Sequence, residues 1–281
     1  MSNKVILIIM DGVGYQTART QCGYLEGAVN AGLARCWKMK ATPPTISASM
    51  YETIHTGLTP IAHGITGNTS LRRSIKPNIF SLCRAAGKRT AAVGHSYFYK
   101  LYVDQPWDPL RSVEHHDENS DIQIGRYYSM EGYGRVNPTA PAEIDLCGQM
   151  IVLTEKWNPD YLLFHTCSTD SIGHFYGGDS PQYRRQTMDV DDALGRTIPI
   201  LLTAGYEIMV TADHGMTAEG GHGGTEDVVC DIPFYYFGPG AGPDGLETLD
   251  QLGIAAAVLD RIGIAPADGM GASFLSGSAS E

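Results

Sequence analysis

Short apolar runs alternate with longer helix-like segments along most of this 281-residue chain. Each run has the length of one strand and is rich in branched or aromatic side chains. The expected strands are Val5–Met10, Thr90–Val93, Tyr161–Phe164, Glu207–Thr211 and Pro233–Phe237. The expected helices are Gly27–Lys38, Pro77–Ala86, Pro141–Trp157, Gln182–Ile198 and Leu249–Ile262. This alternation predicts an α/β fold with a mostly parallel central sheet that helices cover on both faces.

Length and composition predict a single domain over residues 1–281. The chain is 43% apolar and 18% charged, which suits one hydrophobic core near the upper size for a single domain. Residues 96–137 interrupt the alternation, because this segment combines many aromatic side chains with the polar run EHHDENSD. Such an insertion forms either a cap that shapes substrate specificity or a small subdomain with its own aromatic core.

Carboxylate and imidazole side chains follow two of the expected strands where those strands end. Asp11 comes directly after the first apolar run, and Asp213 and His214 follow the fourth strand within TADHGM. Ligands of such folds gather beyond the carboxyl ends of the strands, so we expect these three side chains in one crevice. Oxygen and nitrogen donors together suit a divalent metal ion.

A second group of candidate ligands follows the third expected strand. Asp170 and His174 stand four positions apart in STDSIGH, and they can share an ion if one helical turn or a compact loop joins them. His222 lies in GGHGG, where glycines let the backbone approach whatever the imidazole binds. The chain therefore carries enough donors for two metal ions.

Ser47 is the candidate nucleophile. It precedes a helix that is expected from about Met50 to Thr56. A hydroxyl near a helix N-terminus lies beside unpaired backbone N–H groups and the positive end of the helix dipole. That position suits a nucleophile and a phosphate together.

The order of these motifs resembles the alkaline phosphatase superfamily, and most closely its type I phosphodiesterase and nucleotide pyrophosphatase branch. The resemblance covers nearly the whole chain. It rests on Asp11, on Ser47 after PPTI, on the pair Asp170 and His174, on DHGM, and on the late His222.

The resemblance implies a role for each candidate residue. The two implied ligand sets are Asp11, Asp213 and His214 for one ion, and Asp170, His174 and His222 for the other. Ser47 falls where the nucleophile contacts the first ion, and Asn68 in HGITGN falls where an asparagine binds the phosphate. The expected cofactors are two divalent ions, Zn²⁺ in the first place and Mn²⁺ as the alternative. Without them, three converging aspartates would repel an anionic phosphate.

Three features depart from the nucleotide pyrophosphatase pattern. Serine stands at position 47 where threonine is usual, and Ser49 replaces the usual proline. His222 follows His214 by only eight positions, a short spacing that resembles the phosphoethanolamine transferases of the superfamily.

We therefore expect a metal-dependent phosphoric ester hydrolase, a phosphodiesterase or nucleotide pyrophosphatase that works through a phosphoserine intermediate. The alternatives are a phosphomonoesterase, a phosphonate hydrolase or a phosphoethanolamine-type transferase of the same superfamily. A catalytically silent metal-binding protein is the third alternative, and the complete set of ligand types disfavours it. Monoesterases favour extra cationic groups. Arg72, Arg73 and Lys76 follow Asn68 closely and are candidates for them, although a solvated basic turn is the favoured interpretation.

Charge and hydropathy limit the kinds of partner that this chain can bind. The formal net charge of −11 argues against extended nucleic acid, whose binding relies on clustered Lys and Arg, and favours a small phosphate ester or nucleotide-like substrate. The run VILIIM is too short for a signal or membrane helix, and six scattered cysteines suit reduced thiols. We therefore expect a cytoplasmic protein that needs no membrane. The oligomeric state is left open.

Overall fold

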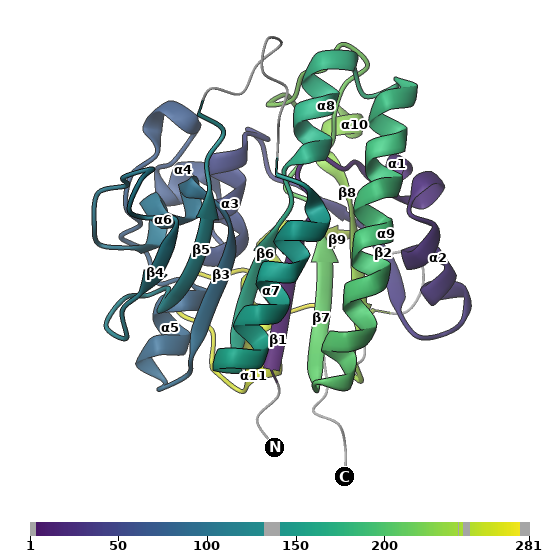
Figure 1. Cartoon of the computed structure of the whole chain (residues 1–281). Coiled ribbons are helices and arrows are strands. Elements are labelled where there is room, and N and C mark those ends of the chain that lie inside the picture. The colour runs from purple at the N-terminus through teal and green to yellow at the C-terminus, as the bar shows by residue number, and fades with distance from the viewer. Residues whose placement is uncertain (1–3, 132–140, 241, 244–247, 276–281) are drawn as a thin grey trace.

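The computed structural model describes residues 4–131, 141–240, 242–243 and 248–275. Within these residues a nine-stranded sheet runs through the molecule in the order β4-β5-β3-β6-β1-β7-β8-β2-β9 (Figure 1). The strands are β1 (Lys4–Ile9), β2 (Arg35–Lys40), β3 (Thr90–His95), β4 (Glu114–His116), β5 (Ile124–Tyr128), β6 (Tyr161–His165), β7 (Tyr206–Thr211), β8 (Asp231–Phe237) and β9 (Leu249–Asp250).

The middle of the sheet is parallel. Strands β5, β3, β6, β1 and β7 pair in parallel, whereas β8 pairs antiparallel with β7 and β2, and β4 pairs antiparallel with β5. Ile9 at the end of β1 is level with His165 of β6 and Thr211 of β7. The carboxyl ends of three neighbouring strands therefore lie together at the same end of the sheet.

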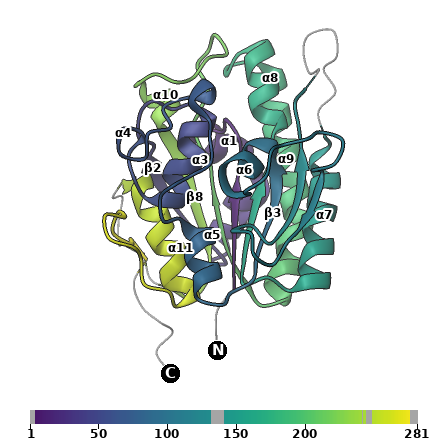
Figure 2. The ribbon, with the colours of Figure 1, turned by 90° about the vertical axis from the view of Figure 1, so that its left-hand side faces the viewer.

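Helices lie on both faces of the sheet, which confirms the predicted α/β fold (Figure 2). One layer contains α1 (Tyr15–Gln21), α2 (Gly23–Asn30), α7 (Glu143–Trp157), α8 (Ser168–Tyr176) and α9 (Pro181–Thr203). The other contains α3 (Ser47–Thr56), α5 (Ile79–Ala85) and α11 (Ile254–Ile262). The shorter helices are α4 (Pro60–His63), α6 (Ser96–Tyr102) and α10 (Asp227–Cys230). Residues 5–9 of β1 are fully buried, because both layers cover this central strand.

Two predicted helices were wrong in part. The helix expected over Gly27–Lys38 ends at Asn30, and Arg35–Lys40 forms strand β2 instead. Trp37 and Met39 are buried and the less buried Lys38 lies between them, which is the two-residue period of a strand that pairs with β8. In the segment Leu249–Ile262, the first two residues form β9 and the α-helix begins only at Ile254.

The aromatic-rich segment extends the main sheet. It supplies α6, β4 and β5, and β5 pairs in parallel with β3. The rings of Tyr99, Trp107 and Tyr127 pack edge to face, with centroids 5.2–6.3 Å apart. Residues 132–137 of the expected insertion lie outside the described residues. Its role as a specificity cap stays a prediction.

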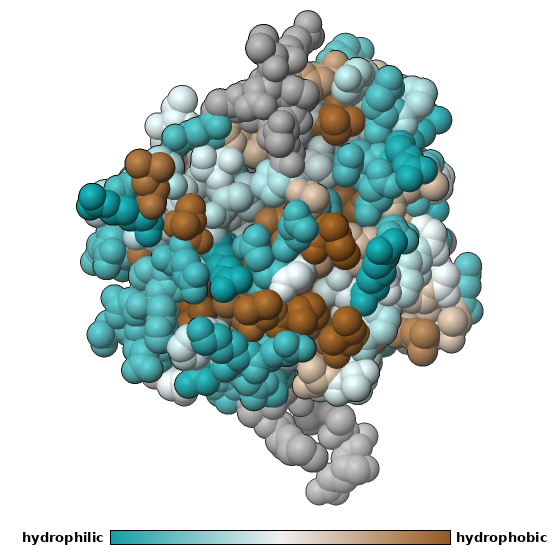
Figure 3. Space-filling model, viewed as in Figure 1, coloured by the Kyte–Doolittle hydropathy of each residue, from teal (hydrophilic) through white to brown (hydrophobic). Residues whose placement is uncertain are grey.

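The molecular surface over α7 and α9 is mostly hydrophilic, with apolar side chains gathered in a short row across it (Figure 3). Val152 of α7 and Met188 of α9 are among the exposed apolar side chains of these helices. In the part of the chain that the structure describes, no helix has both the length and the apolar character that a membrane span requires.

Candidate active site

Asp11 and Asp213 meet at the carboxyl end of the sheet. Each follows its strand by two residues, and the two strands are neighbours. Gly12 has a φ of 73°, and its N–H donates to Asp213 Oδ1 at 3.1 Å. A Cβ at this position would lie 3.0 Å from the Asp170 backbone, so the turn after β1 favours glycine on both counts.

The first ligand cluster consists of Asp11, Asp213 and His214. One donor atom from each lies within 4.8 Å of the others, and all three residues are buried. His214 Nε2 is 3.2 Å from Asp213 Oδ2 and 3.7 Å from Asp11 Oδ1. His214 Nδ1 is 3.0 Å from the Gly215 carbonyl, which can only accept. The imidazole proton therefore belongs on Nδ1, and the Nε2 lone pair faces the carboxylates.

The second ligand cluster consists of Asp170, His174 and His222, whose donor atoms also lie within 4.8 Å of one another. Helix α8 carries the first two residues, so one helical turn joins them. The Nε2 atoms of His174 and His222 lie 3.4 and 3.6 Å from Asp170 Oδ1. Their Nδ1 atoms lie 2.8 Å from the Gly220 carbonyl and 2.7 Å from the Thr45 carbonyl. Both rings therefore turn the Nε2 lone pair toward the carboxylate as well.

The donor set fits two divalent cations. Among the described residues, Asp11 Oδ1, Asp170 Oδ1 and Asp213 Oδ2 are buried atoms without a hydrogen-bond partner. Each faces an imidazole lone pair, and two lone pairs at this distance repel unless a cation or a proton lies between them. Mixed imidazole and carboxylate donors without a thiolate suit several divalent transition-metal ions, zinc and manganese among them.

Burial also perturbs the acid–base behaviour of these groups. Desolvation, with the neighbouring carboxylates, raises the pKa of Asp11 well above its usual range, and desolvation raises the pKa of Asp213 to about 7. Desolvation lowers the pKa of His214, His222 and His165. The imidazoles are therefore neutral donors, and the aspartates need positive charge nearby to remain ionised at neutral pH.

Ser47 is the first residue of α3, three residues before the predicted start of that helix. Its Oγ lies 3.3 Å from His214 Nε2, beside the first cluster. The Ala48 N–H donates to Asn68 Oδ1 at 3.1 Å. Because the amide oxygen faces Ala48, the Asn68 NH₂ group points away from Ala48 and is free to bind another acceptor. Ser47 and Asn68 line the same cavity of about 150 Å³. All eight predicted site residues therefore lie around one end of the sheet.

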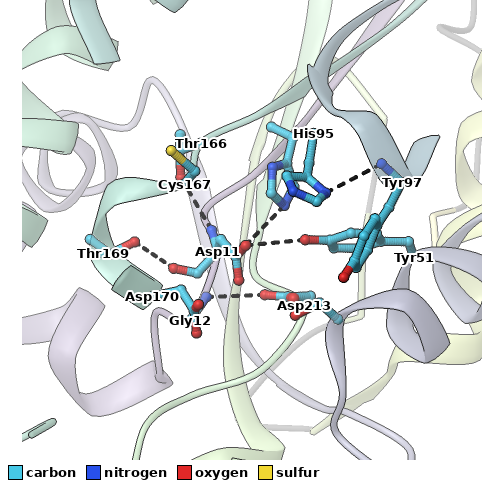
Figure 4. A network of polar contacts seen from close by, with 12 residues as sticks. Asp11, Gly12, Tyr51, His95, Tyr97, Thr166, Cys167, Thr169, Asp170 and Asp213 are labelled. Atoms are coloured by element: carbon cyan, nitrogen blue, oxygen red, sulfur yellow. Dashed lines mark hydrogen bonds and ion pairs between the residues drawn. The ribbon is translucent and has the colours of Figure 1, made fainter. Parts of the chain in front are cut away.

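The cavity has further walls. Tyr51, His95 and Cys167, which the sequence motifs did not indicate, form part of them (Figure 4). Tyr97 and Met130 of the aromatic-rich segment also line the cavity. Tyr51 follows Ser47 by one helical turn, so the spacing alone places both on one face of α3. His95 accepts a hydrogen bond from the Tyr97 N–H, and burial lowers the pKa of His95 to about 3.

No Lys or Arg lines this cavity among the described residues. Arg72 donates to the Gly64 carbonyl at 2.8 Å, and Arg73 lies 3.6 Å from Asp104 and 3.9 Å from Asp121. A larger cavity of about 580 Å³, lined by Tyr15 and Trp37 among others, contains none of the predicted site residues. The basic turn therefore supplies no cation to the cavity beside Ser47.

Residues 5–228 match the family of type I phosphodiesterases / nucleotide pyrophosphatases. The chain belongs to this family. It is 23% identical over 239 residues to the human GPI ethanolamine phosphate transferase 2 catalytic subunit, covering 80% of this chain and 22% of that protein. It is 25% identical over 199 residues to venom phosphodiesterase 2 of Crotalus adamanteus, covering 69% of this chain and 23% of that protein. The chain thus spans less than a quarter of the length of these relatives.

Solved structures share the fold. Murine ectonucleotide pyrophosphatase / phosphodiesterase 5 aligns with a TM-score of 0.74 at 13% identity, over 98% of this chain and 100% of that chain. The lipoteichoic acid synthase LtaP from Listeria monocytogenes aligns with a TM-score of 0.62 at 15% identity, over 97% of this chain and 74% of that chain. The family match and the shared fold confirm the resemblance inferred from the order of the motifs.

Proposed function

We propose that this protein is a metal-dependent phosphoric ester hydrolase, a phosphodiesterase or nucleotide pyrophosphatase that acts through a phosphoserine intermediate at a two-metal site. One observation carries the proposal: Ser47, at a helix N-terminus, lies beside the first ligand cluster, and the second cluster adjoins it. The rings of His214 and His222, one from each cluster, stack with centroids 3.7 Å apart.

The chain's own residues define the course of the reaction. Two divalent ions would be held by the two clusters, and when bound they offset the aspartate charge and favour ionisation of the Ser47 hydroxyl. Ser47 Oγ gives its proton to solvent and attacks phosphorus in line, while the bond from phosphorus to the leaving oxygen breaks and that oxygen takes up a proton to leave as the alcohol. The backbone N–H groups at the start of α3 other than that of Ala48, together with the Asn68 NH₂, hold non-bridging oxygens. A water then attacks phosphorus, and the bond to Ser47 Oγ breaks.

A diester suits this site better than a monoester. A monoester phosphate carries a second negative charge near neutral pH. The cavity beside Ser47 offers no Lys or Arg from the described residues to balance it. A solved structure of an inactive murine ectonucleotide pyrophosphatase / phosphodiesterase 5 variant in complex with AMP supports a small, nucleotide-like substrate.

A phosphoethanolamine-type transferase is the second candidate. The eight-residue spacing from His214 to His222 and the similarity to GPI ethanolamine phosphate transferases both favour it. The first half of the reaction is the same, and an acceptor alcohol then replaces water. The cytoplasmic location expected from the sequence stays a prediction.

A substrate panel tests the proposal. Bis-p-nitrophenyl phosphate, p-nitrophenyl phosphate and a nucleotide phosphodiester are assayed with added zinc or manganese, with and without an acceptor alcohol. We expect diester turnover to exceed monoester turnover. A wide preference for the monoester would contradict the diester assignment, and product transferred mainly to the alcohol would favour the transferase. No turnover of any ester at full metal loading would favour a silent metal-binding protein.

A further inference from the structure

The two carboxylate oxygens of Asp11 have different surroundings (Figure 4). Oδ2 accepts a hydrogen bond from the Tyr51 hydroxyl at 3.1 Å, and His165 Nε2 lies 3.4 Å from it without a hydrogen bond. Oδ1 is buried, has no hydrogen-bond partner among the described residues, and faces His214 Nε2. One oxygen is therefore held by the protein, and the other is presented to the first cluster.

The backbone of Asp11 is held as well. Its N–H donates to Thr166 Oγ1 at 3.2 Å, and its carbonyl accepts from the Thr169 hydroxyl. With the main chain fixed on both sides, rotation of the side chain decides which oxygen reaches a bound ion. The contacts to Oδ2 oppose that rotation.

His165 adds a weaker, electrostatic contact to Oδ2: its Nε2 lies 3.4 Å away and forms no hydrogen bond with any described residue. This fully buried residue ends β6, and its Nδ1 lies 2.8 Å from the Tyr128 hydroxyl. If Tyr128 donates to Nδ1, the single imidazole proton is on Nε2, the nitrogen that lies 3.4 Å from Asp11 Oδ2. Donation to the Thr166 carbonyl at 3.2 Å would instead leave a lone pair facing Asp11, which is repulsive. The Nε2–H tautomer is therefore favoured, and β5 of the aromatic-rich segment supports it through Tyr128.

We propose that Tyr51 and His165 are positioning residues that clamp Oδ2 and keep Asp11 a one-oxygen ligand. This inference rests on the proposed function. A four-coordinate zinc held by Asp11, Asp213 and His214 keeps its fourth position for Ser47 only if neither carboxylate binds with both oxygens. Helix α3 then has two roles, because it carries the nucleophile and, one turn later, the hydroxyl that keeps the ion accessible to it.

Tyr102 provides a matched control. It is buried like Tyr51, and its hydroxyl donates to a carboxylate oxygen of Glu52 at 2.8 Å. Glu52 is the residue after Tyr51 in α3 and belongs to neither ligand cluster. Tyr51→Phe and Tyr102→Phe therefore each remove one buried hydroxyl from one carboxylate, and only the first change touches a candidate ligand.

The test uses Co²⁺ in place of zinc, because four-coordinate Co²⁺ absorbs visible light much more strongly than five- or six-coordinate Co²⁺. In Tyr51→Phe we expect weaker absorption from one equivalent of cobalt and an affinity for that ion about 10- to 100-fold lower by chelator competition. His165→Gln should change both in the same direction. Tyr102→Phe should keep the spectrum and affinity of the unaltered protein, whatever its loss of thermal stability.

A folded Tyr51→Phe variant with unaltered cobalt spectrum and affinity would overturn the clamp and leave the proposed function intact. Failure of the unaltered protein to bind two ions or to cleave any ester would overturn the proposed function, and the clamp with it. If Tyr51→Phe does not fold, a zinc-loaded crystal structure of the unaltered protein decides. Binding through Oδ1 alone supports the clamp, and binding through both Asp11 oxygens contradicts it.

Discussion

The two ligand clusters are built in different ways. The first stands at the ends of β1 and β7, and the side chains of Asp213 and His214 are fully buried. The second stands on helix α8 and on the loop that carries His222, and the His174 side chain is 44% exposed. The sheet therefore fixes the first cluster before any ion arrives, whereas a helix and a loop position the second.

This difference separates two tasks within one site. The buried cluster lies against Ser47, so under the proposed function it would set the position and reactivity of the nucleophile. The more exposed cluster would then face water and the leaving group. We therefore expect changes in the first cluster to abolish activity and changes in the second to weaken it in a way that added metal repairs.

The largest expected effect comes from Ser47→Ala. Loss of the nucleophilic oxygen should lower turnover at least about 10³-fold, while both ions still bind, because the serine is not needed to complete either protein ligand set. Steady-state kinetics and metal analysis of the same sample measure both quantities. Turnover near that of the unaltered protein would show that Ser47 is not the nucleophile.

Substituting one ligand from each cluster compares how strongly activity depends on each ion. Asp213→Ala should lower activity by roughly 10³-fold, as expected for the loss of several kcal/mol of charge stabilisation, and excess zinc should not restore it. His174→Ala should lower activity about 10- to 100-fold at limiting zinc and recover in excess zinc. Equal losses with equal recovery would remove the distinction between the clusters.

The metal-free protein should show an unusual dependence of stability on pH. Asp213, with a pKa of about 7 in the folded protein, binds its proton more tightly there than in the unfolded chain, where the ordinary value is 3.8. The contribution of Asp213 to the free energy of unfolding should therefore be highest below pH 4. It should fall as pH rises toward 7, by at most about 4 kcal/mol.

Thermal unfolding of chelator-treated protein between pH 4 and pH 8 measures this slope, with Asp213→Asn as the control that removes it. Zinc affinity should rise over the same window, because the ion competes with the proton. A difference between the two proteins that is flat with pH would contradict the raised pKa of Asp213.

Loss of the contacts that hold the start of α8, the helix that carries two ligands of the second cluster, should have a smaller effect. Glu143 Oε1 accepts from the N–H groups of Cys167 and Ser168, at 3.2 and 2.9 Å, where α8 begins. Glu143→Ala should loosen this helix, lower the free energy of unfolding by about 1–3 kcal/mol and weaken one ion more than the other. Chelator competition measures the two affinities. An equal change at both ions would show that the first cluster also depends on α8.

The sequence predicts well whatever depends on local pattern. A six-residue apolar run followed by Asp11 indicates a buried strand that delivers a carboxylate, and the four-residue spacing of Asp170 and His174 suits the helix found there. Strand β2 was missed. The side chains of Arg35–Lys40 alternate between polar and apolar only weakly, and it is the pairing with β8 that makes this segment a strand. That pairing joins segments almost 200 positions apart, which no local pattern reports.

The contacts around Asp11 were missed for the same reason. His165 reaches Asp11 because β6 pairs with β1 so that His165 stands level with Ile9. Tyr51 reaches it because α3 packs near the end of the sheet. Each side chain looks like an ordinary core residue in the sequence. Strand register gives His165 its role, and the packing of α3 gives Tyr51 its role.

We have proposed that the two clusters hold two ions beside Ser47. Anomalous diffraction at the zinc edge from a zinc-soaked crystal tests it most directly. We predict two peaks roughly 3.5–4 Å apart, one on Asp11, Asp213 and His214 and the other on Asp170, His174 and His222, with the first at higher occupancy when zinc is limiting. No peak at these residues, or zinc bound only elsewhere on the molecule, would contradict the account.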